Sequence, residues 1–197
     1  MKWSNHELNW GRPLRSILAI FDKKPLKFNF AHLKTVNFTL IEEHGEIKQK
    51  IIKEFDEYHK FLKGNGIIVD HIERAKFISQ KIYSICKSKS YKEFIDESLL
   101  SEVTNLVDKP QVIVAKFDKN YLKLPKEIIK STLQSHQRYF TLFDDKDRMS
   151  NEFVIVTNNK DDKKLIKAGN ERVVEARLSD ANFFWERDKS LNLIKQI

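Results

Sequence analysis

Residues 135–140, Ser-His-Gln-Arg-Tyr-Phe, hold the densest group of side chains in this chain that could recognise a ligand. In a strand, alternate side chains point to opposite faces, so a strand beginning here directs His136 and Arg138 to one side and Gln137 and Tyr139 to the other. Arg138 would then contact a phosphate, while His136 and Gln137 would form hydrogen bonds. Tyr139 would stack on an exposed base. This interpretation predicts an RNA-facing edge.

The same residues also fit a structural network. In that alternative Tyr139 and Phe140 lie in the core, and Arg138 pairs with an acidic residue of the C-terminal helix. The residue types favour the core for Phe140. They leave the roles of His136 and Arg138 open between the two interpretations.

A second segment, residues 169–185, combines charges with three consecutive aromatic side chains. At helical spacing one face of this segment is apolar; it carries Val174, Leu178, Ala181 and Trp185. Favourable charge pairs four residues apart are scarce here. Arg172 and Arg177 must therefore face water, or pair with Glu171, Asp180, another element or another molecule. We expect the aromatic residues 183–185 to serve packing or a subunit interface rather than nucleotide stacking.

Motifs for stand-alone catalysis are missing from the sequence. With five glycines in the whole chain, no glycine-rich phosphate loop can be assembled. His59 and His71 are too isolated to form a zinc site, and no nucleophile stands in a recognisable context. The single cysteine, Cys86, is expected to be a small buried hydrophobic residue. We therefore predict no catalytic residue and no metal ligand.

The charge of the chain allows a polyanionic partner without requiring one. The formal net charge is +8 and the pI is about 9.4, which is typical of attraction to RNA. Lysine far outnumbers arginine, however, and biased codon usage produces the same composition. Residues 1–40 are the most basic quarter, with seven basic and two acidic residues. No apolar run is long enough to span a membrane and no secretion signal is evident, so we expect a cytoplasmic protein.

The pattern of apolar residues predicts an α+β fold, with a mixed or antiparallel sheet, packed helices and a helical C-terminal segment. Strands are expected over 16–21, 26–30, 34–40, 67–69, 111–117, 137–143 and 153–157. Hairpin turns are expected at 23–25 and 144–147. Helices are expected over 47–63, from Asp70 onward, over 94–107, from Pro125 and from 161 onward, with Asn170 as an N-cap after a turn at Gly169. We expect a core domain over 1–160 and a helical segment over 161–197 that packs on it or leads into a further domain.

Four blocks in a specific order resemble the beta subunit of the bacterial two-subunit glycyl-tRNA synthetase. They are Leu124-Pro125-Lys126-Glu127, then residues 135–140, residues 153–159 and residues 169–185. Near the N-terminus, Arg12-Pro13-Leu14-Arg15 matches more loosely. The resemblance covers nearly the whole chain, which is much shorter than a full family member, so we expect a fragment or one domain of a longer subunit.

The resemblance implies a domain similar to the editing-type domain of the phenylalanyl-tRNA synthetase beta chain. In this family the alpha subunit carries the adenylate-forming site, and the whole enzyme uses ATP and magnesium through it. The beta subunit supplies tRNA binding. The implied partners are glycine tRNA, the alpha subunit and the remaining beta-subunit domains, and this domain is expected to contact the acceptor arm. No membrane partner and no cofactor of this segment itself are implied.

Two sets of residues carry over from the family pattern. The candidates for tRNA binding are His136, Gln137, Arg138, Tyr139, Arg172, Arg177, Arg12 and Arg15. The structural signature comprises Asn158, Gly169, Asn170, Glu171, Asp180, Phe184 and Trp185. The chain departs from many relatives at 36–46, where it lacks a Gly-His-Arg-Phe type segment.

Two other functions remain open. The segment could be a docking module whose aromatic C-terminal helix packs on the alpha subunit or on other beta domains, and exposure of residues 183–185 would favour this. It could also hydrolyse mischarged tRNA. The need for such editing is weak, because glycine is the smallest amino acid and a tight pocket excludes larger ones.

Overall fold

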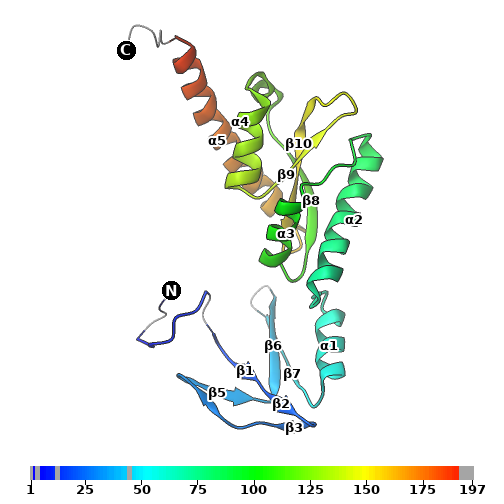
Figure 1. Cartoon of the computed structure of the whole chain (residues 1–197), viewed down its shortest axis with the longest axis vertical. Helices are drawn as coiled ribbons and strands as arrows, with labels where there is room; N and C mark the ends of the chain where they lie inside the picture. The colour runs from blue at the N-terminus through cyan, green and yellow to red at the C-terminus, as the bar shows by residue number, and fades with distance from the viewer. Residues whose placement is uncertain (1, 3–4, 12–13, 44–45, 191–197) are drawn as a thin grey trace. The chain divides into compact units, whose positions relative to one another are not determined.

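The computed structural model describes residues 2, 5–11, 14–43 and 46–190, and it confirms the α+β class. The chain forms two compact units, Met1–Gly66 and Ile67–Ile197 (Figure 1). No feature of the sequence predicts this division at residue 66. The boundary that we expect between 160 and 161 stays a prediction. No helix in the described part of the chain combines the length and apolarity needed to cross a membrane.

Unit 1 is built from short strands and one helix. In chain order these are β1 (Ile17–Leu18), β2 (Ile20–Phe21), β3 (Lys24–Pro25), β4 (Asn29–Phe30), β5 (Leu33–Val36), β6 (Phe38–Glu43), β7 (Glu46–Ile51) and α1 (Phe55–Gly64). They pair as a three-stranded sheet β1-β5-β4 and two hairpins, β2-β3 and β6-β7. The strands expected within 16–40 are therefore present, in shorter pieces.

Two local predictions in unit 1 need correction. Residues 47–51 are not helical, because β7 pairs antiparallel with β6 from Phe38↔Ile51 to Glu43↔Glu46. The helix begins only at Phe55. The first hairpin turn lies at Asp22 and Lys23, one residue earlier than predicted, since Phe21 pairs with Lys24. Both turn residues have positive φ, 47° and 62°, as a two-residue turn matching the strand twist requires.

Unit 2 holds a three-stranded antiparallel sheet with helices on both faces. The strands are β8 (Gln111–Lys116), β9 (Phe140–Phe143) and β10 (Met149–Thr157), in the order β8-β10-β9. The helices are α2 (His71–Lys89), α3 (Glu97–Leu106), the 3-10 helix η1 (Lys119–Lys123), α4 (Lys126–Lys130), the π-helix η2 (Ser131–His136) and α5 (Leu165–Ser190).

Helix starts in unit 2 were predicted with mixed success. Asp70 caps α2 as expected, accepting hydrogen bonds from the backbone N–H groups of Ile72 at 2.7 Å and Glu73 at 3.0 Å. Residues 67–69 do not form a strand. Gly169 and Asn170 lie inside α5 rather than in a turn before it. The start of α5 is bonded instead by the Asp161 carboxylate, which accepts the backbone N–H groups of residues 166 and 167.

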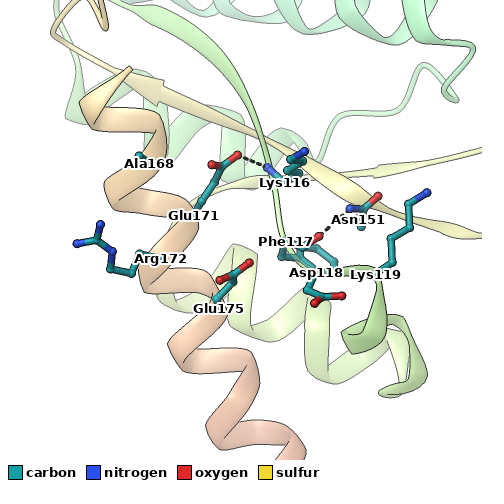
Figure 2. A pocket seen from close by; sticks show the side chains of 9 residues that line it. All are labelled: Lys116, Phe117, Asp118, Lys119, Asn151, Ala168, Glu171, Arg172 and Glu175. Carbon is teal, nitrogen blue, oxygen red and sulfur yellow. Dashed lines mark hydrogen bonds between the residues drawn. The ribbon is translucent and has the colours of Figure 1, made fainter. Parts of the chain in front are cut away.

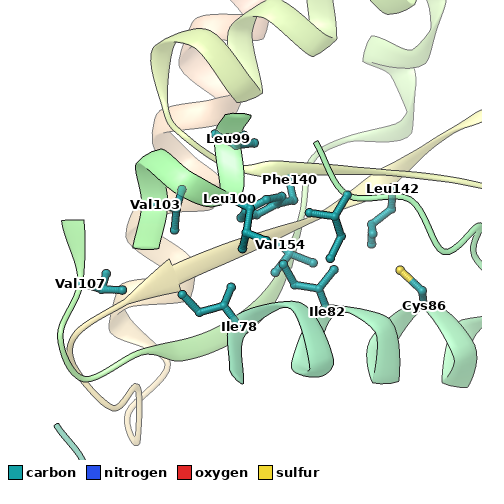
Figure 3. Packing of buried hydrophobic residues seen from close by; sticks show 11 residues of the cluster. Ile78, Ile82, Cys86, Leu99, Leu100, Val103, Val107, Phe140, Leu142 and Val154 are labelled. Atoms are coloured by element: carbon teal, nitrogen blue, oxygen red, sulfur yellow. The ribbon is translucent and has the colours of Figure 1, made fainter. Parts of the chain in front are cut away.

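The side chains of the sheet alternate between two cores. Val154, Phe140 and Leu142 point to the face covered by α2 and α3, where Ile78, Ile82 and the predicted buried Cys86 pack (Figure 3). On the other face, Phe153 and Ile155 pack with Leu133 of η2 and with Val174 and Leu178 of α5. Neighbouring residues of β10 thus belong to different cores, as the period of a strand dictates. This second core positions the candidate site residues.

Candidate nucleic-acid interface

Arg138 lies at a reversal of the chain, not in a strand. Helical structure continues through η2 to His136, and β9 starts only at Phe140, so the predicted alternation of residues 136–139 does not occur. Arg138 itself has a φ of 61°, a left-handed conformation that is uncommon for a residue with a side chain. This conformation turns the chain from η2 into β9.

The guanidinium of Arg138 is held by other parts of unit 2. Its Nε lies 2.5 Å from the carboxylate of Glu102, and its Nη1 donates to the carbonyl oxygens of Ser135 and Gln134. The ionic partner is on α3, so our alternative of a partner on the C-terminal helix was wrong. Nothing in the sequence pairs positions 102 and 138, because the contact depends on how α3 lies beside η2. These residues also line a cavity of about 310 Å³.

Tyr139 is buried, with 7% of its surface exposed. Its ring stacks on Phe153 with 5.3 Å between centroids, and its hydroxyl donates to the side-chain oxygen of Asn170 in α5. Burial raises the pKa of the Tyr139 phenol. The core interpretation of Tyr139 and Phe140 is the one that the structure shows, and the Tyr139 ring does not lie on an exposed edge.

His136 and Gln137 are less constrained than their neighbours. His136 is exposed and Gln137 is half-buried. Within the described part of the chain, neither side chain has a hydrogen-bonding or ionic partner. His136 is therefore accessible for hydrogen bonding, as the first interpretation requires.

Arg172 and Arg177 lie on the solvent side of α5 and are both exposed. Neither forms an ion pair with any residue that the structure describes. Glu171, by contrast, accepts the backbone N–H of Lys116 at 2.9 Å and so bonds α5 to the edge strand β8. In Figure 2, Glu171 points toward β8, whereas Arg172 points away from it.

A groove runs between α5 and the end of β8. It has a volume of about 570 Å³, and Lys116, Asp118, Lys119, Glu171, Arg172 and Glu175 supply its charged lining (Figure 2). Positive and negative side chains alternate there. Sequence reasoning missed Lys116 and Lys119, which have no distinguishing motif. Among the residues described, no group of three His, Cys, Asp or Glu side chains is arranged to hold a metal ion.

Several signature residues join elements of unit 2. The side-chain oxygen of Asn158 accepts the backbone N–H groups of Asp108 at 2.9 Å and Lys109 at 3.1 Å. Asn170 accepts from Tyr139 and donates to the carbonyl of Ile166. Trp185 packs against the second core. These contacts hold loops and helices in register.

The other signature residues lie at the surface of α5. Phe184 is 58% exposed and its neighbour Phe183 62%, and the two rings meet edge to face with 5.5 Å between centroids. Asp180 and Gly169 are exposed as well. A Cβ at Gly169 would meet no atom within 4 Å, so packing does not require glycine there.

The remaining arginine candidates belong to unit 1. Arg15 lies 2.8 Å from the Glu42 carboxylate, and both side chains are largely exposed. Arg12 falls outside the described residues. Of the candidates for tRNA binding in unit 2, Tyr139 is the one that a printed hydrogen bond joins to α5, through Asn170.

Comparison with known proteins identifies relatives among glycine–tRNA ligase beta subunits. A family described as "Glycyl-tRNA synthetase beta subunit" matches residues 1–197. A glycine–tRNA ligase beta subunit of Syntrophomonas wolfei is 34% identical over 98% of this chain and 28% of its own length. That of Rickettsia bellii is 34% identical over 98% of this chain and 30% of its own. That of Dictyoglomus turgidum is 35% identical over 95% and 27%. The chain spans less than a third of these relatives.

Proposed function

Because this chain belongs to the glycyl-tRNA synthetase beta subunit family, we propose that it is the part of a glycine–tRNA ligase that engages the acceptor arm of glycine tRNA. In this proposal the adenylation of glycine, with ATP and magnesium, takes place on the alpha subunit. The chain contributes binding and orientation of the tRNA, and it works in the cytoplasm with the alpha subunit and the remaining beta-subunit domains.

The availability of two arginines supports this proposal. Arg172 and Arg177 are exposed on α5 without an ionic partner in the described part of the chain, whereas Arg138 is held by Glu102. A free guanidinium can form two parallel hydrogen bonds with a phosphate. An arginine already bound to a carboxylate must first break that pair. Arg172 and Arg177 are therefore the stronger candidates for backbone contacts, and exposed His136 on η2 is a further candidate.

A titration of the chain with glycine tRNA at two or more salt concentrations tests this proposal. We expect affinity to fall as salt rises, because each phosphate contact releases counterions. The double variant Arg172→Ala/Arg177→Ala should weaken binding roughly 10-fold or more. It should also reduce the slope of log affinity against log salt concentration by the contribution of about two phosphate contacts.

The matched control is Arg148→Ala combined with Lys146→Ala. It removes the same net charge from the exposed 144–148 loop, where Arg148 pairs with Asp144. If both double variants bind tRNA equally, α5 is not the contact surface. Salt-independent binding by the parent chain would exclude a phosphate-dominated contact.

The exposed Phe183–Phe184 pair favours a second candidate, docking of α5 on another protein surface. Exposed aromatic pairs at a helix surface are typical of interfaces. Phe183→Ser/Phe184→Ser should abolish co-purification with the alpha subunit while tRNA affinity is unchanged. Retained co-purification would reject docking at this position.

Hydrolytic editing stays a prediction, and a deacylation assay with mischarged tRNA tests it.

A further inference from the structure

Unit 1 exposes a row of apolar side chains along one extended segment. Leu26, Phe28 and Phe30 are 44%, 48% and 43% exposed. The backbone is held on both sides, since Leu26 donates to the carbonyl of Ala19 and Thr35 donates to that of Phe28. Phe30 lies in β4, and Phe28 continues the pairing with β5 through its hydrogen bonds to Thr35. Because side chains two residues apart share one side of a paired strand, these two rings lie on the same side, and Leu26 precedes them in the sequence, outside the paired strand. The segment is thus a fixed platform rather than a loose loop.

Lysines surround this row. Lys24, Lys27 and Lys34 are exposed, and within the described part of unit 1 none of them forms an ion pair. Between residues 15 and 34 the basic residues are Arg15 and Lys23, Lys24, Lys27 and Lys34, against the single acid Asp22, a net charge of +4. A partner that covers the row must therefore tolerate or neutralise several cations.

The aromatic pair on α5 stands in a different electrostatic setting. Residues 171–190 carry four basic side chains, Arg172, Arg177, Arg187 and Lys189, and five acidic ones, Glu171, Glu175, Asp180, Glu186 and Asp188, a net charge of −1. Aromatic side chains with no net positive charge favour a protein surface. Aromatic side chains within a cationic rim favour a polyanion with flat faces, which is a nucleic acid.

We propose that residues 24–30, together with Lys34, bind single-stranded RNA. Phe28 and Phe30 stack on bases, and Lys24, Lys27 and Lys34 contact phosphates. Two residues along a strand advance about 6.8 Å, roughly twice the 3.4 Å between bases along one duplex strand. The platform therefore fits nucleotides splayed apart, as single-stranded regions of RNA are. The choice of RNA as the partner rests on the proposed function. The inference adds a second RNA contact, which lies in unit 1.

The test is fluorescence anisotropy with a labelled 12-nucleotide oligouridine and the full 197-residue chain at low salt. Phe28→Leu/Phe30→Leu keeps two exposed apolar side chains but removes both rings. We expect it to weaken binding roughly 10-fold or more, because each lost ring removes a stacking contact with a base. Lys24→Gln/Lys27→Gln should lower the salt slope by about 1.4, since each single-strand phosphate contact contributes about 0.7. Circular dichroism checks that each variant is folded.

The matched control is Phe183→Leu/Phe184→Leu, which makes the same change on α5 and should leave oligouridine affinity unaltered. Equal affinity of the parent chain and the Phe28/Phe30 variant overturns the inference, as does an equal loss in the α5 variant. If the Phe28/Phe30 variant is not folded, an unchanged salt slope in the lysine variant overturns it instead. Failure of the Arg172/Arg177 experiment affects only the proposed acceptor-arm contact, because that experiment uses structured tRNA and other residues.

Discussion

The two units place their characteristic side chains in opposite environments. In unit 2, Asn158, Asn170 and Glu171 bond to other elements, and Tyr139 and Trp185 pack on a shared core. In unit 1, the described hydrophobic residues that are fully buried are Ile41, Ile52 and Leu62, whereas Trp10, Phe21, Leu26, Phe28, Phe30, Leu40, Ile47, Ile51 and Phe55 are exposed. Unit 2 exposes large hydrophobic residues as well, among them Ile72, Phe94, Leu165, Phe183 and Phe184, but it also encloses two buried cores.

This contrast shows that the residues that identify the family differ from the residues that are available to contact a ligand. Three of the residues that make the sequence recognisable in unit 2, Asn158, Asn170 and Glu171, have demanding geometry, since their side chains form hydrogen bonds that join different elements. Ligand contact requires the opposite property, which is a side chain without an internal partner. In unit 2 that describes Arg172, Arg177 and His136, and in unit 1 the lysines and aromatics of residues 24–34.

The largest effect is expected where the second core is densest. Leu178→Ala should lower the free energy of unfolding of unit 2 by about 3 kcal/mol, because Leu178 is fully buried and its removal leaves a cavity. The matched change in unit 1, Ile51→Ala, should cost less than about 0.5 kcal/mol, since Ile51 is 59% exposed. Urea denaturation of both variants measures the difference. Similar losses would remove the contrast between the units.

The Asn158 contact should come next. Asn158→Ala removes the side-chain acceptor of the backbone N–H groups of Asp108 and Lys109. The first bond is exposed and the second half-buried, so water replaces part of the interaction and we expect a loss of about 1–2 kcal/mol. The neighbouring Asn159→Ala should change stability by less than about 0.5 kcal/mol, because the Asn159 side chain is exposed. If the two variants unfold at the same urea concentration, the signature asparagine has no structural role.

The sequence predicted a helix or strand correctly where the residues of that element alone determine its structure. Asp70 three residues before Glu73 predicted the start of α2, and the spacing of Val174, Leu178, Ala181 and Trp185 predicted the buried face of α5. A strand was likewise predicted over residues 111–117, from an apolar run after Pro110, and β8 forms at Gln111–Lys116. In each case the local pattern and the tertiary packing agree.

The predictions were wrong or incomplete where contacts between residues far apart in the sequence determine the structure. Ile47 and Ile51 are four residues apart, a spacing that places them on one face of a helix and also on one face of a strand, and pairing with β6 selects the strand. Glu102 is an ordinary surface acid until α3 places it beside Arg138. The exposed aromatics of unit 1 look like core residues in the sequence. Their exposure follows from the small size of the unit, which provides few elements to cover them.

Removing the Tyr139 hydroxyl should have a smaller effect. Tyr139→Phe leaves the Asn170 oxygen without its donor, and we expect a loss of about 1 kcal/mol near neutral pH. Burial raises the pKa of the Tyr139 phenol, so its stabilising contribution is complete below the unfolded tyrosine pKa of about 10 and is lost as pH rises through the folded value. The difference between parent and variant should therefore shrink in alkaline urea titrations. A difference that grows above pH 10 would contradict this account.

The smallest effect is expected at Arg138, where two contributions oppose each other. Arg138→Ala removes a partly exposed ion pair with Glu102, worth less than about 1 kcal/mol, and it keeps a Cβ at a φ of 61°. Arg138→Gly removes the same pair but suits the left-handed backbone, so it should be more stable than Arg138→Ala by several tenths of a kcal/mol up to about 1 kcal/mol. Thermal unfolding of both variants measures that difference. If glycine is no better than alanine, the reversal at residue 138 is maintained without backbone strain, and the contacts of the guanidinium with Glu102, Ser135 and Gln134 explain why an arginine stands there.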